Sequence, residues 1–320
     1  MQMVRPLAAL VAAVALAAPA AAQQIGIGTM GQGTAGYSMA AAIAKVLSEK
    51  AKLAARVQPA GGTSAYVPLI DSGELDFGVV NIIEAKEALT GTGVFQGKKQ
   101  SNIRMVAVLY PFRNGMFVRK DSKMKTTADL KGAAVPYGYT SQLTLKAITD
   151  AFLANGGLSI ADVKQVLVPN VLRGADEFAA GKADAALFAL GAGKVAETNA
   201  AVGGIRFLDM DDSPAAVARM QKVLPEAYVV TVNPSPALAG ILAPSKIMAY
   251  DYVLLAGKHV KDDLVGKVVE TLAANKAALI ESFTGFQGFD AARMAKTLPV
   301  EYHPGAIAAY TKLGHWPPKP

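Results

Sequence analysis

Residue types that carry covalent or metal chemistry are scarce in this chain. It has no cysteine and only three histidines, His259, His303 and His315, which are well separated in the sequence. The absence of cysteine excludes disulfide scaffolds, thiolate zinc sites, iron–sulfur clusters and cysteine nucleophiles. The histidines do not have the spacing of a metal-ligand motif. We therefore expect no bound metal or cofactor, and among the hypotheses that follow we favour a protein that is not an enzyme.

Two segments imitate catalytic or cofactor motifs. Gly26–Gly31 has the sequence G-x-G-x-x-G of a dinucleotide-binding loop. The dinucleotide-binding fold needs a longer strand before this loop and an acidic residue at the end of the second strand. The predicted second strand, Arg56–Pro59, is not followed by an acidic residue. Gly36–Ala40 approximates the nucleophile elbow around Ser38, although a loop of about eight residues separates it from the strand that should precede it directly. A secreted serine hydrolase that uses Ser38 with His303 or His259 stays open as a third hypothesis.

Binding chemistry is better represented, in loops rich in glycine and hydroxyl side chains. Such loops occur at Thr29–Gly36, Gly61–Ser64 and Gly138–Ser141, each directly before a predicted helix. The first N–H groups of a helix lack intrahelical acceptors, and the positive end of the helix dipole lies there. These loops therefore favour the binding of a carboxylate or a phosphate.

Alternating strand and helix patterns position these loops and predict an α/β fold. In the first half we expect strands at Ile25–Gly28, Arg56–Pro59 and Phe77–Val80 and a helix over Tyr37–Lys50. In the second half we expect strands at Ala133–Tyr137 and Val163–Val168, with helices over Leu143–Asn155 and Val171–Ala180.

The two halves also share a short sequence echo. Gly73–Val80 and Gly181–Phe188 both place an acid three residues after the glycine and end in four consecutive apolar or glycine positions, at an offset of 108 residues. Together with the shared order of elements, this offset indicates two similar lobes that face each other across a ligand cleft. We expect one lobe from residues 23–112 plus 211–320, the other from residues 113–210, and a hinge where the chain crosses near Leu109–Phe117.

The N-terminal segment has the pattern of a secretory signal peptide. One basic residue, Arg5, precedes the apolar stretch Leu7–Ala18, and small residues follow up to Ala22. We expect residues 1–22 to be removed after Ala22 and the mature chain to be periplasmic. The formal charge of +7 comes from scattered basic residues. Without a basic stripe or a recognition motif we expect no nucleic-acid partner.

The chain resembles the TAXI family, the extracytoplasmic solute receptors of one class of TRAP transporters. Short blocks in matching order carry this resemblance: Gly28–Tyr37, Pro59–Ser64, Ser72–Val80, Leu109–Pro111, Val118–Ser122, Ala128–Gly132, and His303–Ala306 with Tyr310 and Gly314 behind it. Where the family commonly has two adjacent tyrosines, this chain has Gly36-Tyr37.

The resemblance implies a type II periplasmic binding protein fold with a ligand cleft between two hinged α/β lobes. It also implies capture of a small anionic solute, amino acid or dicarboxylate-like, by a monomer that delivers it to a sodium-driven membrane permease. A binding protein of similar fold for an ABC importer or a tripartite tricarboxylate importer is the second hypothesis.

We expect the solute to contact polar loops from both lobes. In these loops hydroxyl and N–H groups can hold carboxylate oxygens, Tyr37 is the family-derived contact, and Arg113 could clamp a carboxylate. The expected ligand-binding residues are Met30, Gly31, Gln32, Gly33, Thr34, Tyr37, Thr63, Ser64, Asn81, Arg113, Tyr139, Thr140, Ser141, Phe188 and Ala189.

Overall fold

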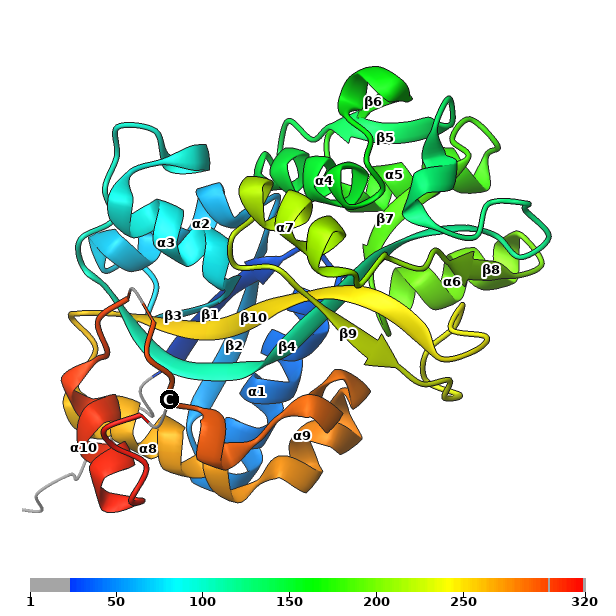
Figure 1. Cartoon of the computed structure of the whole chain (residues 1–320). Coiled ribbons are helices and arrows are strands. Elements are labelled where there is room, and N and C mark those ends of the chain that lie inside the picture. The colour runs from blue at the N-terminus through cyan, green and yellow to red at the C-terminus, as the bar shows by residue number, and fades with distance from the viewer. Residues whose placement is uncertain (1–23, 299, 319–320) are drawn as a thin grey trace, which may run out of the picture.

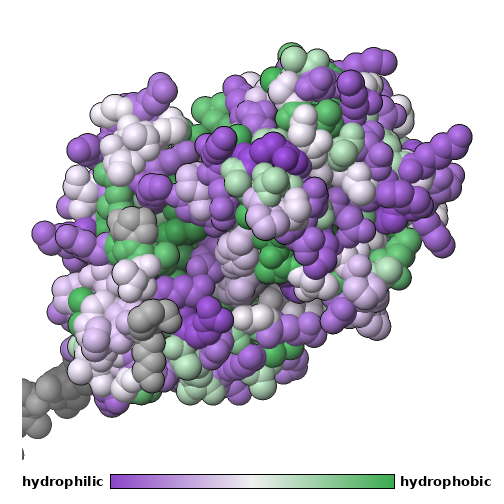
Figure 2. Space-filling view, in the orientation of Figure 1, coloured by the Kyte–Doolittle hydropathy of each residue, from purple (hydrophilic) through white to green (hydrophobic). Residues whose placement is uncertain are grey.

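The computed structural model describes residues 24–298 and 300–318 (Figure 1). The predicted signal peptide, residues 1–22, lies outside the described residues. Within them, no helix is both long and apolar enough to cross a membrane. The face seen in Figure 2 is mostly hydrophilic, with hydrophobic side chains visible mainly in recesses.

The first group of elements is built on three parallel strands. β1 pairs with both β2 and β3, and α1 covers β1 and β2 with a face that buries Met39, Ile43 and Leu47. The C-terminal helices α8 and α9 pack on α1, and α10 packs on α8. The bounds are β1 Gln24–Met30, β2 Ala54–Ala60, β3 Phe77–Asn81, α1 Ala35–Ala51, α2 Thr63–Ser72, α3 Ile82–Thr90, α8 Asp262–Ala274, α9 Lys276–Ser282 and α10 Pro304–Lys312.

The second group repeats this plan. β5 pairs in parallel with β6, β7 lies beside β5, and α5 packs on these strands. The aromatic rings of Phe117, Phe178 and Phe207 meet in its core. The bounds are β5 Ala134–Gly138, β6 Lys164–Val168, β7 Ala185–Ala189, β8 Ile205–Phe207, α4 Thr144–Asn155, α5 Val171–Ala179, α6 Gly193–Ala201 and α7 Pro214–Val223.

Two long antiparallel strands, β4 (Ile103–Arg119) and β10 (Ser245–Gly257), join the groups (Figure 1). β10 pairs with β3 near its C-terminal end and with β9 (Tyr228–Val232) at its N-terminal end. β4 pairs with β7 and β8 in its C-terminal part. The fold is therefore α/β with two lobes that share these two strands. Short 3-10 helices complete it at Gly93–Phe95, Thr127–Leu130, Ile160–Asp162, Thr284–Gly288 and Ala291–Arg293.

The lobe boundaries expected from the sequence, 23–112 plus 211–320 and 113–210, stay predictions. The segment Leu109–Phe117, where the chain was expected to cross, lies within β4. α7 packs on α4, and β9 pairs with Ser245–Ala249 of β10. We propose on these contacts that the second lobe runs to about residue 249 and that β10 is the return crossing.

The sequence echo has a structural counterpart at the start of each lobe. Asp76 Oδ2 accepts a hydrogen bond from Gly26 N at 2.8 Å, and Asp184 Oδ2 accepts one from Ala134 N at 2.7 Å. Residues 26 and 134 differ by 108, as do residues 76 and 184. The acid in each echo thus ties the third strand of its lobe to the first, which accounts for the repeated residue type.

The glycines of the G-x-G-x-x-G segment have a packing role. A Cβ atom at Gly28 would lie 2.6 Å from side-chain atoms of both Leu75 and Tyr66, and one at Gly26 would lie 2.7 Å from Leu75. Both glycines lie inside β1 rather than in a loop before a helix. They allow the segment around α2 to pack closely on the strand.

Candidate functional site

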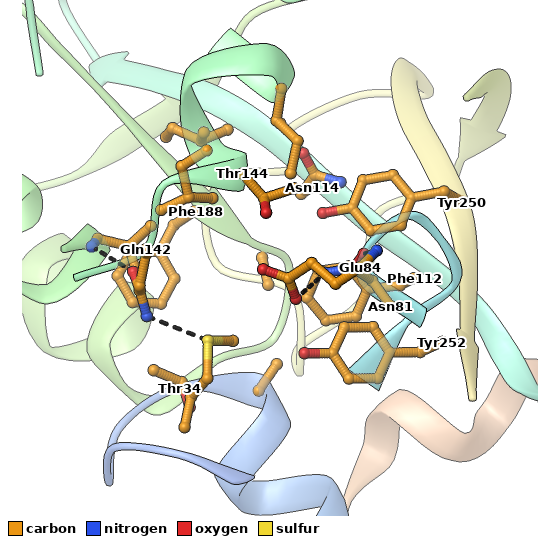
Figure 3. A pocket seen from close by; sticks show the side chains of 17 residues that line it. Thr34, Asn81, Glu84, Phe112, Asn114, Gln142, Thr144, Phe188, Tyr250 and Tyr252 are labelled. Carbon is orange, nitrogen blue, oxygen red and sulfur yellow. Dashed lines mark hydrogen bonds between the residues drawn. The ribbon is translucent and has the colours of Figure 1, made fainter. Parts of the chain in front are cut away.

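A cavity lies where the carboxyl ends of β1, β3 and β7 meet the crossing strands (Figure 3). In α/β sheets this edge is the common place for ligands. In this closed arrangement the cavity volume is about 50 Å³, and the cavity is lined by 17 residues from both lobes. A mostly apolar lining with a few convergent polar groups is typical of sites for small molecules.

In the first lobe, two capped helix N-termini border the cavity. Thr34 caps α1, and its Oγ1 accepts from Tyr37 N at 3.1 Å and donates to Gly31 O at 2.7 Å. Asn81 caps α3, and its Oδ1 accepts from Glu84 N at 2.8 Å. Because Thr and Asn are preferred caps, the sequence favours helix starts at these positions. Ala35, in the first turn of α1, and Glu84, in the first turn of α3, also line the cavity.

Among the described residues that line the cavity, Glu84 is the only one with an acidic or basic side chain. Only 6% of the residue is exposed. Its Oε2 accepts hydrogen bonds from Thr63 Oγ1 at 2.5 Å and from Asn81 Nδ2 at 2.7 Å. Burial raises the pKa of the Glu84 carboxyl to about 7, and repulsion from Glu87 acts in the same direction. Hydrogen bonds from Thr63, Thr144 and Asn81 oppose this shift in the pKa of Glu84.

Aromatic rings from the crossing strands form the wall next to Glu84. The ring of Phe112 lies 5.6 Å from that of Tyr250 and 4.4 Å from that of Tyr252, between centroids. Burial raises the pKa of both tyrosine hydroxyls, so both rings stay neutral. Figure 3 shows the hydroxyl ends of Tyr250 and Tyr252 directed toward the cavity.

Several buried polar atoms at this wall have no hydrogen-bond partner among residues 24–298 and 300–318. They include Oδ1 and Nδ2 of Asn114, of which 3% is exposed, and the hydroxyl of Tyr252, of which 1% is exposed. Buried polar groups in folded proteins are nearly always paired, and each unpaired group costs about 1–3 kcal/mol. These atoms are therefore candidates for hydrogen bonds to a bound solute.

The second lobe contributes a matching set of helix starts. Gln142 lies just before α4, and its Oε1 accepts from Val171 N at 2.9 Å, where α5 begins. Thr144, the first residue of α4, also lines the cavity, and Figure 3 shows its hydroxyl directed toward Glu84. Four helix N-termini, two from each lobe, thus converge on one cavity.

The 108-residue offset also relates the cavity residues to one another. Thr34 corresponds to Gln142, Thr63 to Val171, and Asn81 to Ala189 at this offset. Five of these six residues line the cavity, and Thr63 supports Glu84 from just behind it. The repeat thus places equivalent positions of both lobes around one cleft.

Direct contacts across the cleft hold the two lobes together. Gln142 Nε2 donates to Met30 Sδ at 3.0 Å, and Lys194 N donates to Gly33 O at 3.3 Å. Lys86 of α3 forms an ion pair of 2.6 Å with Glu226, which precedes β9. The lobes are in a closed arrangement.

The structure brings some of the expected binding residues together and places others elsewhere. Five line the cavity: Met30, Thr34, Asn81, Phe188 and Ala189. Thr63 bonds Glu84, Ser141 faces Gly62 across the cleft, and Gly31 and Gly33 face Leu172. Outside the lining, Gln32, Ser64 and Thr140 are exposed, Tyr37 is half-buried, and Tyr139 is buried beside Tyr137. The whole set stays a prediction.

Arg113 lies on β4 between two residues that line the cavity, Phe112 and Asn114. Successive side chains of a strand point to opposite faces. Arg113, which was expected to bind a carboxylate of the solute, therefore lies beside the cavity in sequence, but its side chain is not part of the lining.

Seven of the ten polar and aromatic residues in the lining were not expected from the sequence. They are Glu84, Phe112, Asn114, Gln142, Thr144, Tyr250 and Tyr252. Gln142 could have been found by adding 108 to Thr34, and Glu84 by the Asn-x-x-Glu spacing of a capped helix start. Tyr250 and Tyr252 lie on β10, a strand that the sequence patterns did not reveal.

The contacts of Ser38 and His303 do not support the hydrolase hypothesis. Ser38 lies within α1, and its Oγ donates to Thr34 O at 3.3 Å. His303 is buried, caps α10, and its Nδ1 accepts from Gly305 N at 3.2 Å. These contacts give both side chains structural roles.

Comparisons with known proteins agree with this geometry. The profile of the NMT1-like family matches residues 27–314. The fold is similar to that of PhnD1 from Prochlorococcus marinus in complex with methylphosphonate, at 12% identity and a TM-score of 0.57, covering 91% of this chain and 98% of that one. It is also similar to a structure described as a periplasmic transporter, at 14% identity and a TM-score of 0.57, covering 81% and 85% of the two chains.

Proposed function

The chain belongs to the NMT1-like family, and from this premise we propose that it is an extracytoplasmic receptor that captures a small organic acid between its lobes. The observation that carries this proposal is the convergence of four helix N-termini on one cavity. Fixed N–H donors and helix dipoles bind carboxylate oxygens without a cationic side chain. PhnD1 has a similar fold, and its structure is in complex with methylphosphonate. This complex supports a small acid as the solute of this chain.

We further propose delivery of the solute to a sodium-driven TRAP-type permease, from a mature periplasmic protein cleaved after Ala22. The blocks of the TAXI resemblance support this partner. Delivery to an ABC importer or a tripartite tricarboxylate importer is the alternative. A neighbouring gene for a large fused permease would favour the first, and one for an ATPase would favour an ABC importer.

A thermal-shift screen tests the receptor function. We expect at least one small acid, among amino acids, 2-oxo acids and dicarboxylates, to raise the melting temperature. At 100 times its dissociation constant a ligand stabilises the folded state by about 2.7 kcal/mol. Neutral sugars are the matched control. A shift with sugars and none with any acid would overturn the proposed function.

A further inference from the structure

The orientation of the Glu84 carboxylate leaves one oxygen for a solute. Thr63 and Asn81 both donate to Oε2, at 2.5 and 2.7 Å. The side chain of Asn81 is itself held in place, because its Oδ1 accepts a hydrogen bond from Glu84 N. Figure 3 shows the second carboxylate oxygen directed into the open part of the cavity. Oε1 is thus held as a hydrogen-bond acceptor on the side of the carboxylate toward which the Thr144 hydroxyl also points.

The charge of the cavity favours a donor with a positive charge at this oxygen. Glu84 is the one charged side chain in the lining that the described residues provide. Above its pKa of about 7 the Glu84 carboxylate would repel a solute carboxylate placed against it, and repulsion is strong in a poorly hydrated site. An ammonium group would meet an opposite charge and form a charge-assisted hydrogen bond.

The surrounding side chains fit the same group. The rings of Phe112, Tyr250 and Tyr252 flank Glu84, and the two tyrosine hydroxyls directed toward the cavity can accept hydrogen bonds from an ammonium group. Asn114 Oδ1 is buried and offers a further acceptor. The end of the cavity at Glu84 and Asn114 thus suits an ammonium group, while the helix N-terminus at Thr34 suits a carboxylate.

The remaining lining limits the body of the solute. Leu145, Ile148, Leu187 and Phe188 form an apolar wall. A second carboxylate on the solute would be desolvated against this wall without a partner, which is costly. The wall therefore favours an apolar body.

We propose that Glu84 receives the amino group of a small zwitterion with an apolar body, and that the receptor selects such amino acids over dicarboxylates. This inference rests on the proposed function, because it names the class of acid that the same cavity takes.

Isothermal titration calorimetry with matched pairs of probes tests the inference. Each pair is an apolar amino acid and the 2-oxo acid of the same skeleton: valine with 3-methyl-2-oxobutanoate, leucine with 4-methyl-2-oxopentanoate, and phenylalanine with phenylpyruvate. Succinate represents the dicarboxylates. The variant is Glu84→Gln, whose amide oxygen can still accept from Thr63 and Asn81. The control is Glu49→Gln, which removes the same charge from an exposed position of α1.

We expect the best amino acid to bind at least 10-fold more tightly than its 2-oxo partner. Because hydrogen bonds to charged groups contribute about 1.5–3 kcal/mol, Glu84→Gln should weaken this amino acid by about 10- to 100-fold. Glu49→Gln should leave the affinity unchanged. Circular dichroism and the melting temperature of Glu84→Gln show whether the variant is folded.

Three results would overturn the inference. Binding of a 2-oxo acid or succinate at least as tight as that of every amino acid would leave the receptor intact but remove the ammonium contact. Unchanged amino-acid affinity in folded Glu84→Gln would show that another group receives the amine. Binding of none of these probes, with a neutral sugar bound instead, would overturn the proposed function as well.

Discussion

Replacement of Gly62 by alanine is expected to weaken solute binding by a factor on the order of 10 to 100. In the closed arrangement a Cβ atom at Gly62 would lie 1.9 Å from the carbonyl oxygen of Ser141 in the opposite lobe. That oxygen cannot move away easily, because Ser141 N donates to Pro169 O and Gln142 N donates to Tyr139 O. Overpacking of this kind costs about 1–3 kcal/mol, and opening the cleft to relieve it separates the contacts that close on the solute.

The backbone of Gly62 makes this test selective for closure. Its φ of −177° and ψ of 168° are extended values that alanine adopts without strain. Folding of each lobe should therefore be unaffected, and the ligand-free melting temperature should change little. Gly61→Ala is the matched control, because its Cβ would have its nearest contact at 4.0 Å, with Ser141 Cβ. Equal affinities of the two variants, measured by calorimetry, would show that the solute does not require this closed arrangement.

The second prediction concerns the stability of the ligand-free protein between pH 4.5 and pH 8. The pKa of Glu84 is about 7 in the folded state, against 4.5 for a freely hydrated glutamate side chain. The folded protein thus holds a proton more tightly than the unfolded chain, and the unfolding free energy falls as pH rises from about 4.5 to about 7. Above this window the carboxyl is ionised in both states and its contribution is constant.

Comparison with Glu84→Gln isolates this contribution. One pKa unit corresponds to about 1.4 kcal/mol, so wild type should lose about 3 kcal/mol relative to the variant across the window. Urea unfolding of both proteins at a series of pH values measures the difference, and Glu49→Gln should follow wild type. Parallel curves for wild type and Glu84→Gln would mean that the folded protein does not shift the titration of Glu84.

Several parts of the fold could be predicted from local sequence. The alternation of apolar runs and helix periods located β1, β2, β3, β5 and β6, and the helices α1, α4 and α5, to within a few residues. The echo at Asp76 and Asp184 revealed the repeat, because each acid must bond the backbone of the first strand in its own lobe. The helix caps Thr34 and Asn81, whose side chains supply the missing intrahelical acceptors, were not recognised as caps from the sequence.

Other parts depend on contacts between distant segments and were not predictable in the same way. β10 is buried along almost its whole length, so it lacks the polar alternation that reveals a strand with one exposed face. Tyr250 and Tyr252 reach the cavity only through its pairing with β3 and β4. Arg113 and Asn114 are adjacent in sequence, and only the orientation of β4 decides which side chain faces the cavity. The role of Glu84 depends on Thr63, 21 residues earlier in the chain.

A crystal structure of the protein with the tightest-binding small acid from the screen tests the proposed receptor site most directly. We predict that the solute lies in the cleft between the lobes, with its carboxylate at the helix N-terminus near Thr34 and its other end next to Glu84 and Asn114. A solute bound outside this cleft, with the cavity lining unaltered, would contradict the central claim that the cavity is the receptor site.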